Sequence, residues 1–251
     1  MENLRGYLES KGVETGWKFD NLLLLAPTGS KAYGTDTEDS DTDYFGVTVP
    51  PIEYYMGLNS FETYNKKNGK NVLNTKEDVD VTLFSLNKFV KNCAEGEPQA
   101  LELMYLEEGQ YLVVTELGKE LLRNREMFLS KKVIKKYGMF ALHCRKRMEK
   151  GRKDYVEKYG YDTKQFQHSV RLYEMLFEIL KEGKFTTKRK NAGYLKELRK
   201  GKYTLEQAVK LLEGYEEELQ VLKEESPLRE KCDYSKVDKF LVDLNKRALG
   251  M

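Results

Sequence analysis

Residues Gly29 to Gly46 read G-S-K-A-Y-G-T-D-T-E-D-S-D-T-D-Y-F-G, a glycine-containing turn followed by closely spaced carboxylates. The four leucines at 22–25, before the turn, predict a buried strand that Pro27 brings to an end. Gly29 permits backbone conformations closed to other residues and the close approach of a phosphate, to which Ser30 and the next amides can donate hydrogen bonds. The turn is therefore suited to binding an anion.

Two carboxylates follow this turn. Asp41 and Asp43 are separated by one residue and lead into a β-rich run at 44–49, so in a strand both side chains would project from one face. Hard divalent cations prefer such oxygen ligands, and the pair therefore indicates metal-dependent chemistry on a nucleotide. The alternative is a solvated acidic loop made by the acids of residues 36–43, which are Asp36, Glu38, Asp39, Asp41 and Asp43.

A third carboxylate lies in the run V-D-V-T-L-F at 79–84. Asp80 is embedded there among β-branched and aromatic residues, and the burial of an unpaired carboxylate is costly unless a metal offsets it. A site with two cations about 3.5–4 Å apart needs ligands from more than one strand, and Asp80 supplies such a ligand. The alternative places Asp80 at a strand edge, facing water together with Asp78.

A long helix is predicted to begin near Asp162, with Asp162 or Thr163 as its N-cap. At roughly 100° per residue, Lys164, His168 and Arg171 share one stripe as i, i+4 and i+7. The apolar side chains fall almost opposite, at Phe166, Val170, Tyr173, Phe177 and Leu180. The alternative to a binding role for the stripe is an ordinary solvated helix face.

The net charge of +2 in 251 residues conceals an uneven distribution of charge. Residues 131–153 hold ten Lys or Arg against Glu149 alone, and residues 184–202 hold eight against Glu197 alone. Clustered cations near a nucleotide site favour a polyanionic acceptor, because their binding to backbone phosphates releases the counterions condensed there into solution. The alternative is a pair of basic solvated helix faces without functional consequence.

The order of these patterns predicts an α+β fold. Residues 1–115 alternate strands and helices and form a predicted catalytic domain, and residues 116–251 form a predicted helical domain that contributes nucleotide- and acceptor-binding residues. Helices are expected near 86–93, 116–127, 131–158, 163–182, 191–200, 204–223 and 235–248. The polar segment 65–76 is expected to form a hairpin tip or mobile loop. No apolar run or leader pattern points to a membrane, so a cytoplasmic protein is expected.

Several motifs together resemble a known family. They are Gly29-Ser30, Ala32-Tyr33-Gly34, Ser40-Asp41-x-Asp43-x-x-Gly46, Asp80-Val-Thr-x-x-Ser85-Leu86-x-Lys88-Phe89, Glu97-Pro98-x-x-Leu101-Glu102-Leu103 and Tyr161-Asp162-x-Lys164-x-x-x-His168-x-x-Arg171-Leu172. This set is similar to the polymerase-beta-type nucleotidyltransferase superfamily, and within it to RNA-repair-associated predicted nucleotidyltransferases, often encoded by phages and bacteria. Glu97 departs from the asparagine expected before the proline.

The resemblance implies a mixed sheet with packed helices, followed by a helical part. It implies two Mg²⁺ ions, with Mn²⁺ as an alternative, on Asp41, Asp43 and Asp80, the last also a candidate general base. It further implies that Gly29 and Ser30 hold the triphosphate, with Lys31 as a candidate helper. The helix stripe of Lys164, His168 and Arg171 would then bind nucleotide phosphates.

The favoured hypothesis is an enzyme that transfers a nucleoside monophosphate from an NTP to an RNA end, tRNA included, in RNA repair. A second hypothesis is AMP transfer to a hydroxyl of a protein or small molecule, and a third is a catalytically silent nucleic-acid-binding module. The three aspartates argue against the third, because like charges repel when no metal is present. The sequence leaves open the base, the acceptor and whether an RNA ligase or kinase works beside the protein.

Overall fold

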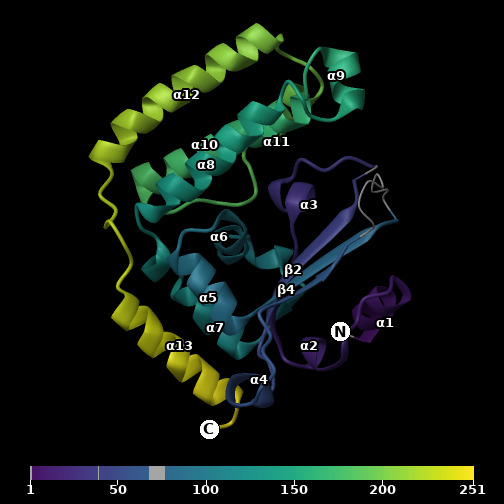
Figure 1. Cartoon of the computed structure of the whole chain (residues 1–251), viewed down its shortest axis with the longest axis vertical. Helices are drawn as coiled ribbons and strands as arrows, with labels where there is room; N and C mark the ends of the chain where they lie inside the picture. Colours follow the sequence, from purple (N-terminus) through teal and green to yellow (C-terminus); the bar gives the residue numbers. More distant parts are fainter. Residues whose placement is uncertain (1, 39, 68–76) are drawn as a thin grey trace.

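The computed structural model describes residues 2–38, 40–67 and 77–251 (Figure 1). Within these residues the strands form one five-stranded sheet in the order β3-β4-β2-β1-β5. The sheet is mixed, because β2 and β4 are parallel and the other neighbours are antiparallel. The strands are β1 Leu22–Pro27, β2 Thr42–Thr48, β3 Thr63–Lys66, β4 Val79–Ser85 and β5 Val113–Val114. The predicted α+β fold is confirmed.

The two faces of the sheet belong to two different apolar clusters, as the period-2 alternation of strands requires. On one face Val81 and Leu83 of β4 pack with Leu8 and Phe19, which come from α1 (Glu2–Ser10) and α2 (Gly16–Asp20). On the other face Phe45 of β2 joins the larger core. That core is built with the helices α5 Leu86–Ala94, α6 Pro98–Met104 and α7 Glu116–Arg123.

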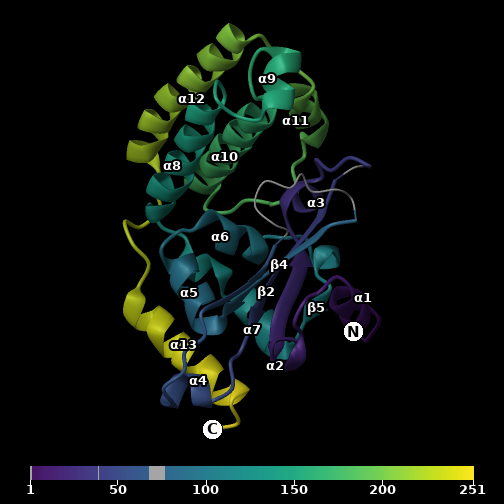
Figure 2. The ribbon, with the colours of Figure 1, turned by 45° about the vertical axis from the view of Figure 1, so that its right-hand side comes forward.

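The second half of the chain is helical and is organised around α10 (Thr163–Glu182), which packs against α8, α11 and α12 (Figure 2). The last helix, α13, returns to pack against α5. The remaining helices are α3 Gly29–Tyr33, α4 Glu53–Met56, α8 Lys132–Arg147, α9 Lys153–Tyr159, α11 Ala192–Arg199, α12 Leu205–Glu225, α13 Tyr234–Ala248, and the 3-10 turns Glu108–Gln110 and Arg125–Phe128. The division into domains near residue 115 stays a prediction.

One predicted helix, 131–158, is in fact two helices, α8 and α9, separated around Gly151. The cause is the start of α10: Asp162 caps the amides of Lys164 and Gln165, and its other carboxylate oxygen accepts the amide of Arg152 at 2.8 Å. A β-carbon on Gly151 would lie 2.2 Å from that oxygen. The chain therefore breaks where the capping carboxylate packs against it.

Two further findings concern the sequence predictions. In the polar segment 65–76, residues 68–76 lie outside the described residues, while Asn65 and Lys66 belong to β3. Across the described ranges, no helix combines the length and the apolar character needed to cross a membrane.

Candidate active site

Two of the three predicted aspartates occupy paired positions on neighbouring parallel strands. Asp43 of β2 is the register partner of Asp80 of β4, so both side chains leave the same face of the sheet. Asp41 directly precedes β2. β4 lies between β3 and β2, but its pairing with β3 ends at Val81, so among the described residues the strand partner of Asp80 is on the β2 side.

The turn after β1 approaches these carboxylates closely. Gly29 has a φ of +64°, and a β-carbon there would lie 2.7 Å from Oδ2 of Asp43. The amide of Thr28 donates to the backbone carbonyl of Asp43 at 2.8 Å, which fixes the turn against β2. Lys31 points its ammonium at the hydroxyl of Thr42. Only glycine lets the backbone of α3 begin this close to the Asp43 carboxylate.

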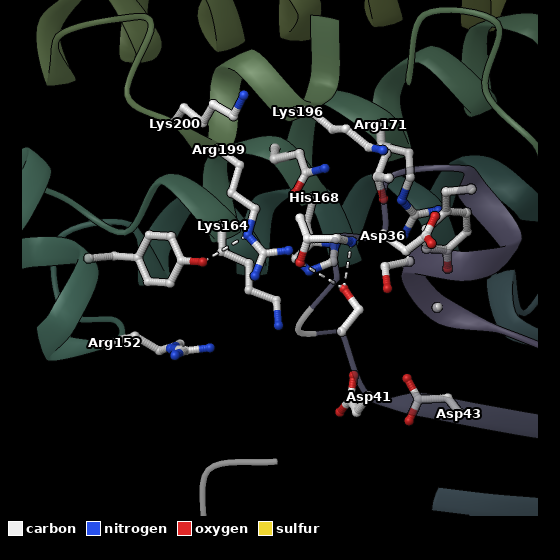
Figure 3. A pocket seen from close by; sticks show the side chains of 18 of the residues that line it. Asp36, Asp41, Asp43, Arg152, Lys164, His168, Arg171, Lys196, Arg199 and Lys200 are labelled. Atoms are coloured by element: carbon white, nitrogen blue, oxygen red, sulfur yellow. Dashed lines mark hydrogen bonds between the residues drawn. The ribbon is translucent and has the colours of Figure 1, made fainter. Parts of the chain in front are cut away.

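A cavity of about 1020 Å³ opens over the turn and carries opposite charges on its two sides. Gly29, Ser30, Asp41 and Asp43 line one side. Cations line the other side, and they come from α10, from α11 and its C-cap, and from the N-cap of α9, namely Arg152, Lys164, Arg171, Lys196, Arg199 and Lys200. In Figure 3 the basic side chains stand across the cavity from Asp41 and Asp43. The arrangement suits a ligand that has both anionic groups and bound cations.

Burial and mutual repulsion both act on the acidic side. Burial, together with the charges of Asp41 and Asp80, raises the pKa of Asp43 to about 6. Carboxylate oxygens are the ligands that Mg²⁺ prefers, and a divalent cation would relieve the repulsion between them. The side chains present are therefore of the chemical type that binds Mg²⁺. Among the described residues, however, no three acidic, histidine or cysteine side chains are placed to hold an ion as they stand. The metal site therefore stays a prediction.

The stripe predicted on α10 does face the cavity, but its three members differ in character. The ammonium of Lys164 has no hydrogen bond or ion pair to a described residue, and burial together with Arg199 and Arg152 lowers its pKa. Burial and the cations Arg171, Lys164 and Arg199 lower the pKa of His168 to about 3, so His168 is neutral near pH 7. The expected row of three cations is thus interrupted by an uncharged group.

Arg171 lies in the cavity wall and is held by a buried network. Its guanidinium donates to Glu102 at 2.8 Å and stacks 3.7 Å above the ring of Tyr33, whose hydroxyl donates to the other Glu102 oxygen at 2.6 Å. Glu102 and Arg171 are 5% and 4% exposed. Three motifs far apart in the sequence therefore meet here. Whether Arg171 also binds phosphate stays a prediction.

Glu97, where the sequence departs from the expected asparagine, pairs with Lys136 of α8. It does not line the cavity as described. The departure therefore changes a contact between the start of α6 and α8 and leaves the carboxylate site intact.

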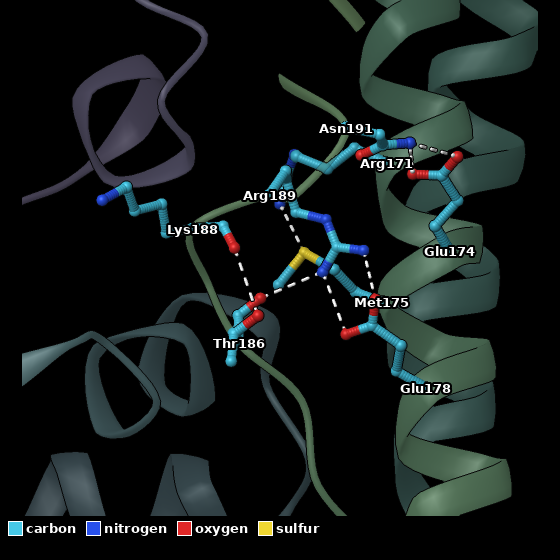
Figure 4. Close-up of polar contacts among 8 residues, drawn as sticks. All are labelled: Arg171, Glu174, Met175, Glu178, Thr186, Lys188, Arg189 and Asn191. Carbon is cyan, nitrogen blue, oxygen red and sulfur yellow. Dashed lines mark hydrogen bonds and ion pairs between the residues drawn. The ribbon is translucent and has the colours of Figure 1, made fainter. Parts of the chain in front are cut away.

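The connection from α10 to α11 ties the helical part to α3. Arg189 pairs with Glu178 of α10 (Figure 4). The backbone amide of Arg189 donates to the backbone carbonyl of Tyr33 at 3.1 Å. Asn191 donates to both carboxylate oxygens of Glu174 at 3.0 and 3.1 Å. The last residue of α3 is thus fixed from the same helix that carries Lys164 and His168.

Sequence reasoning identified the basic segments but not the positions that reach the cavity. Arg152, Lys196, Arg199 and Lys200 line it, and Arg199 donates to the hydroxyl of Tyr155 at 2.8 Å. The signal was the excess of Lys and Arg in 131–153 and 184–202. Gln167, which also lines the cavity, gave no signal.

A mixed sheet with carboxylates on neighbouring strands, beside a glycine turn and a basic cavity wall, defines a nucleotidyltransferase type of site. The chain matches the RNA repair pathway DNA polymerase beta family, RlaP, over residues 2–243, and it belongs to this family.

Two individual proteins are similar to the chain. Over 78 residues it is 40% identical to an uncharacterized 38.9 kDa protein from the nrdC-mobD intergenic region of Enterobacteria phage T4; the match covers 31% of this chain and 23% of that relative. A nucleotidyltransferase-like protein from Exiguobacterium sibiricum 255-15, of known crystal structure, is 12% identical, with coverage of 97% of this chain and 75% of the other. Its TM-score of 0.31 is too low to support an inference.

Proposed function

We propose that the protein is a Mg²⁺-dependent nucleotidyltransferase that transfers a nucleoside monophosphate from an NTP to the terminal hydroxyl of an RNA, tRNA included, in RNA repair. The observation that carries the proposal is the juxtaposition of Asp43 and Asp80 in register, with Gly29 against Asp43 and a basic wall across the cavity. The family to which the chain belongs supports the same chemistry.

In the proposed reaction the acceptor oxygen attacks the α-phosphorus of the NTP, a new phosphodiester bond forms, the bond between the α- and β-phosphates breaks, and pyrophosphate leaves. Asp41, Asp43 and Asp80 would hold the metal ions. When bound, Mg²⁺ lowers the pKa of an attacking hydroxyl and neutralises charge on the phosphates.

The chain's own groups have separate tasks. Asp80 is proposed to accept the proton of the acceptor hydroxyl, and the backbone and hydroxyl of Gly29 and Ser30 to hold the triphosphate. Lys164 is proposed to offset phosphate charge, since its ammonium lines the cavity without a partner among the described residues. Basic residues farther along the wall, Lys196 and Lys200, are proposed to contact the acceptor backbone.

The test incubates the protein with Mg²⁺, each α-³²P-labelled NTP and a pool of RNA ends that includes tRNA, and then resolves RNA and protein separately. The matched samples are the Asp41→Asn, Asp43→Asn double variant and Asp238→Asn, a change of the same chemistry at an exposed position on α13. Label on RNA that is lost in the double variant and kept in Asp238→Asn supports the proposal and identifies the base.

Two other outcomes refute it. Label on protein alone would favour AMP transfer to a protein hydroxyl, and label that persists in the double variant would place the chemistry elsewhere. RNA ends with a 3′-hydroxyl and with a 3′-phosphate are tested side by side, because a requirement for a prior kinase or phosphatase step, or for a ligase afterwards, would show as a dependence on the chemistry of the end.

A further inference from the structure

Two neighbouring uncharged polar side chains of α10 reach the cavity wall and make no side-chain hydrogen bonds with described residues. Gln167 and His168 of α10 both line the cavity. Gln167 is 4% exposed, so nearly all of it is withdrawn from solvent. Its amide atoms are not among the buried unpaired polar atoms of the described residues, so they reach the cavity itself. An amide that has no protein partner and reaches a cavity is available to a ligand.

The chemistry of the two groups is matched more fully by a ligand part other than phosphate. Phosphate oxygens near neutral pH only accept hydrogen bonds. A glutamine amide offers both donors and an acceptor, and a neutral imidazole offers one of each. His168 is neutral because burial and the nearby Arg171, Lys164 and Arg199 hold its pKa far below 7. A ligand part that both donates and accepts would use the donors and the acceptors of both groups, whereas a phosphate would use only their donors.

The cavity already supplies cations for the charged part of a nucleotide. Lys164 lies one turn before His168 on α10, about 6 Å along the helix axis, and it interacts electrostatically with Asp41 and Asp43. Arg199 and Lys196 stand on α11. In Figure 3 His168 lies farther than Lys164 from Asp41 and Asp43.

We propose that Gln167 and His168 form the subsite that recognises the nucleoside part of the incoming nucleotide, through its base edge or its ribose hydroxyls. The base edge and the ribose hydroxyls both present hydrogen-bond donors and acceptors together, whereas a phosphate presents acceptors only. This inference rests on the proposed function, and it gives His168 a role different from the phosphate binding predicted from sequence. It also gives a role in nucleoside recognition to Gln167, which no pattern in the sequence had pointed to.

The experiment measures binding of α,β-methylene NTP analogues, which cannot be cleaved between the α- and β-phosphates, by isothermal titration calorimetry with Mg²⁺. One arm compares the four bases, and the other compares the ribo, 2′-deoxy and 3′-deoxy forms of the tightest binder. The variants are Gln167→Met and His168→Phe, which keep approximate shape. The matched control is Gln165→Met, since Gln165 is on the same helix but does not line the cavity.

Wild-type protein is expected to discriminate by about tenfold or more in at least one arm, because a site built for a hydrogen bond rejects a ligand that lacks it. Gln167→Met or His168→Phe should reduce that ratio to about threefold or less, and Gln165→Met should keep it. The arm in which discrimination is lost identifies base or sugar. The melting temperature of Gln167→Met should stay equal or rise, because no protein hydrogen bond is removed.

Three results overturn the inference. If the wild type binds all analogues equally, or if both variants keep its discrimination, the subsite is wrong while nucleotide binding still supports the proposed function. If Gln167→Met melts at a lower temperature with unchanged selectivity, Gln167 is structural. If no analogue binds the wild type, the proposed function itself fails, and the inference fails with it.

Discussion

Replacement of Glu102 by leucine should be one of the most destabilising single changes in this chain. The carboxylate accepts a hydrogen bond from Arg171 at 2.8 Å and another from the Tyr33 hydroxyl at 2.6 Å, and it is 5% exposed. Glu102→Leu would leave the Arg171 charge buried over the Tyr33 ring without a counterion. The Tyr33 hydroxyl would lose its acceptor at the same time.

The magnitude follows from these contacts. Removing one partner of a buried ion pair costs about 3–5 kcal/mol, and a buried hydroxyl left unpaired costs about 1–3 kcal/mol. The two losses overlap, so Glu102→Leu should lower the free energy of unfolding by about 4 kcal/mol. Removing both charges with Glu102→Leu and Arg171→Met should cost only about 1–2 kcal/mol, because no uncompensated charge remains. The coupling between the two sites should then be about 3 kcal/mol or more.

The assay is urea unfolding, followed by far-UV circular dichroism and by fluorescence of the single tryptophan, Trp17. The control is Glu218→Gln, which breaks the exposed pair between Lys181 and Glu218 (2.7 Å) and should leave unfolding unchanged within error. Equal losses from Glu102→Leu and from the double variant, or losses from the two single variants that simply add, would refute the argument that the Glu102 charge compensates Arg171.

Three further outcomes are expected. Gly29→Ala should lower NMP transfer more than tenfold and cost about 1 kcal/mol of stability, because its β-carbon would sit 2.7 Å from Asp43 at a φ of +64°; unchanged transfer would contradict this. Asp43→Asn should abolish transfer yet raise the melting temperature in EDTA by about 2–4 °C through relief of like-charge repulsion, and a lower melting temperature would count against that repulsion. Because the folded pKa of His168, about 3, lies below its unfolded value, stability should fall as pH drops below 6.5; between pH 8 and pH 5 the wild type should lose about 1–2 kcal/mol more than His168→Gln in urea unfolding, and parallel losses would refute this.

Within single elements, the sequence was sufficient to predict much of this structure. The leucines at 22–25 mark β1, because a short continuous apolar run that ends at turn residues is typical of a strand buried on both faces. The apolar runs around Phe45 and Val81 mark β2 and β4, and in β4 burial alternates from one residue to the next. The cap of α10 at Asp162 also follows from local chemistry, since the carboxylate and the amides that it accepts are neighbours in the chain.

Which strands and helices contact one another could not be predicted from the sequence in the same way. The register that sets Asp43 opposite Asp80 joins strands 37 positions apart in the chain, with a segment between them. The break near Gly151 depends on a carboxylate from the next helix. Periodicity describes the faces of one helix or strand and contains no information about which face of another element will meet it.

The sequence by itself therefore determined the α+β class, and it pointed to the aspartates and the basic segments as candidate site residues. These inferences depend on residue type and on spacing along one element. Only the tertiary structure decided that Arg171 is paired with Glu102, that His168 is neutral and that Gln167 faces the cavity unpaired. These properties depend on which charges and apolar groups surround a side chain, and the surroundings come from segments that are distant in sequence and meet only when the chain folds.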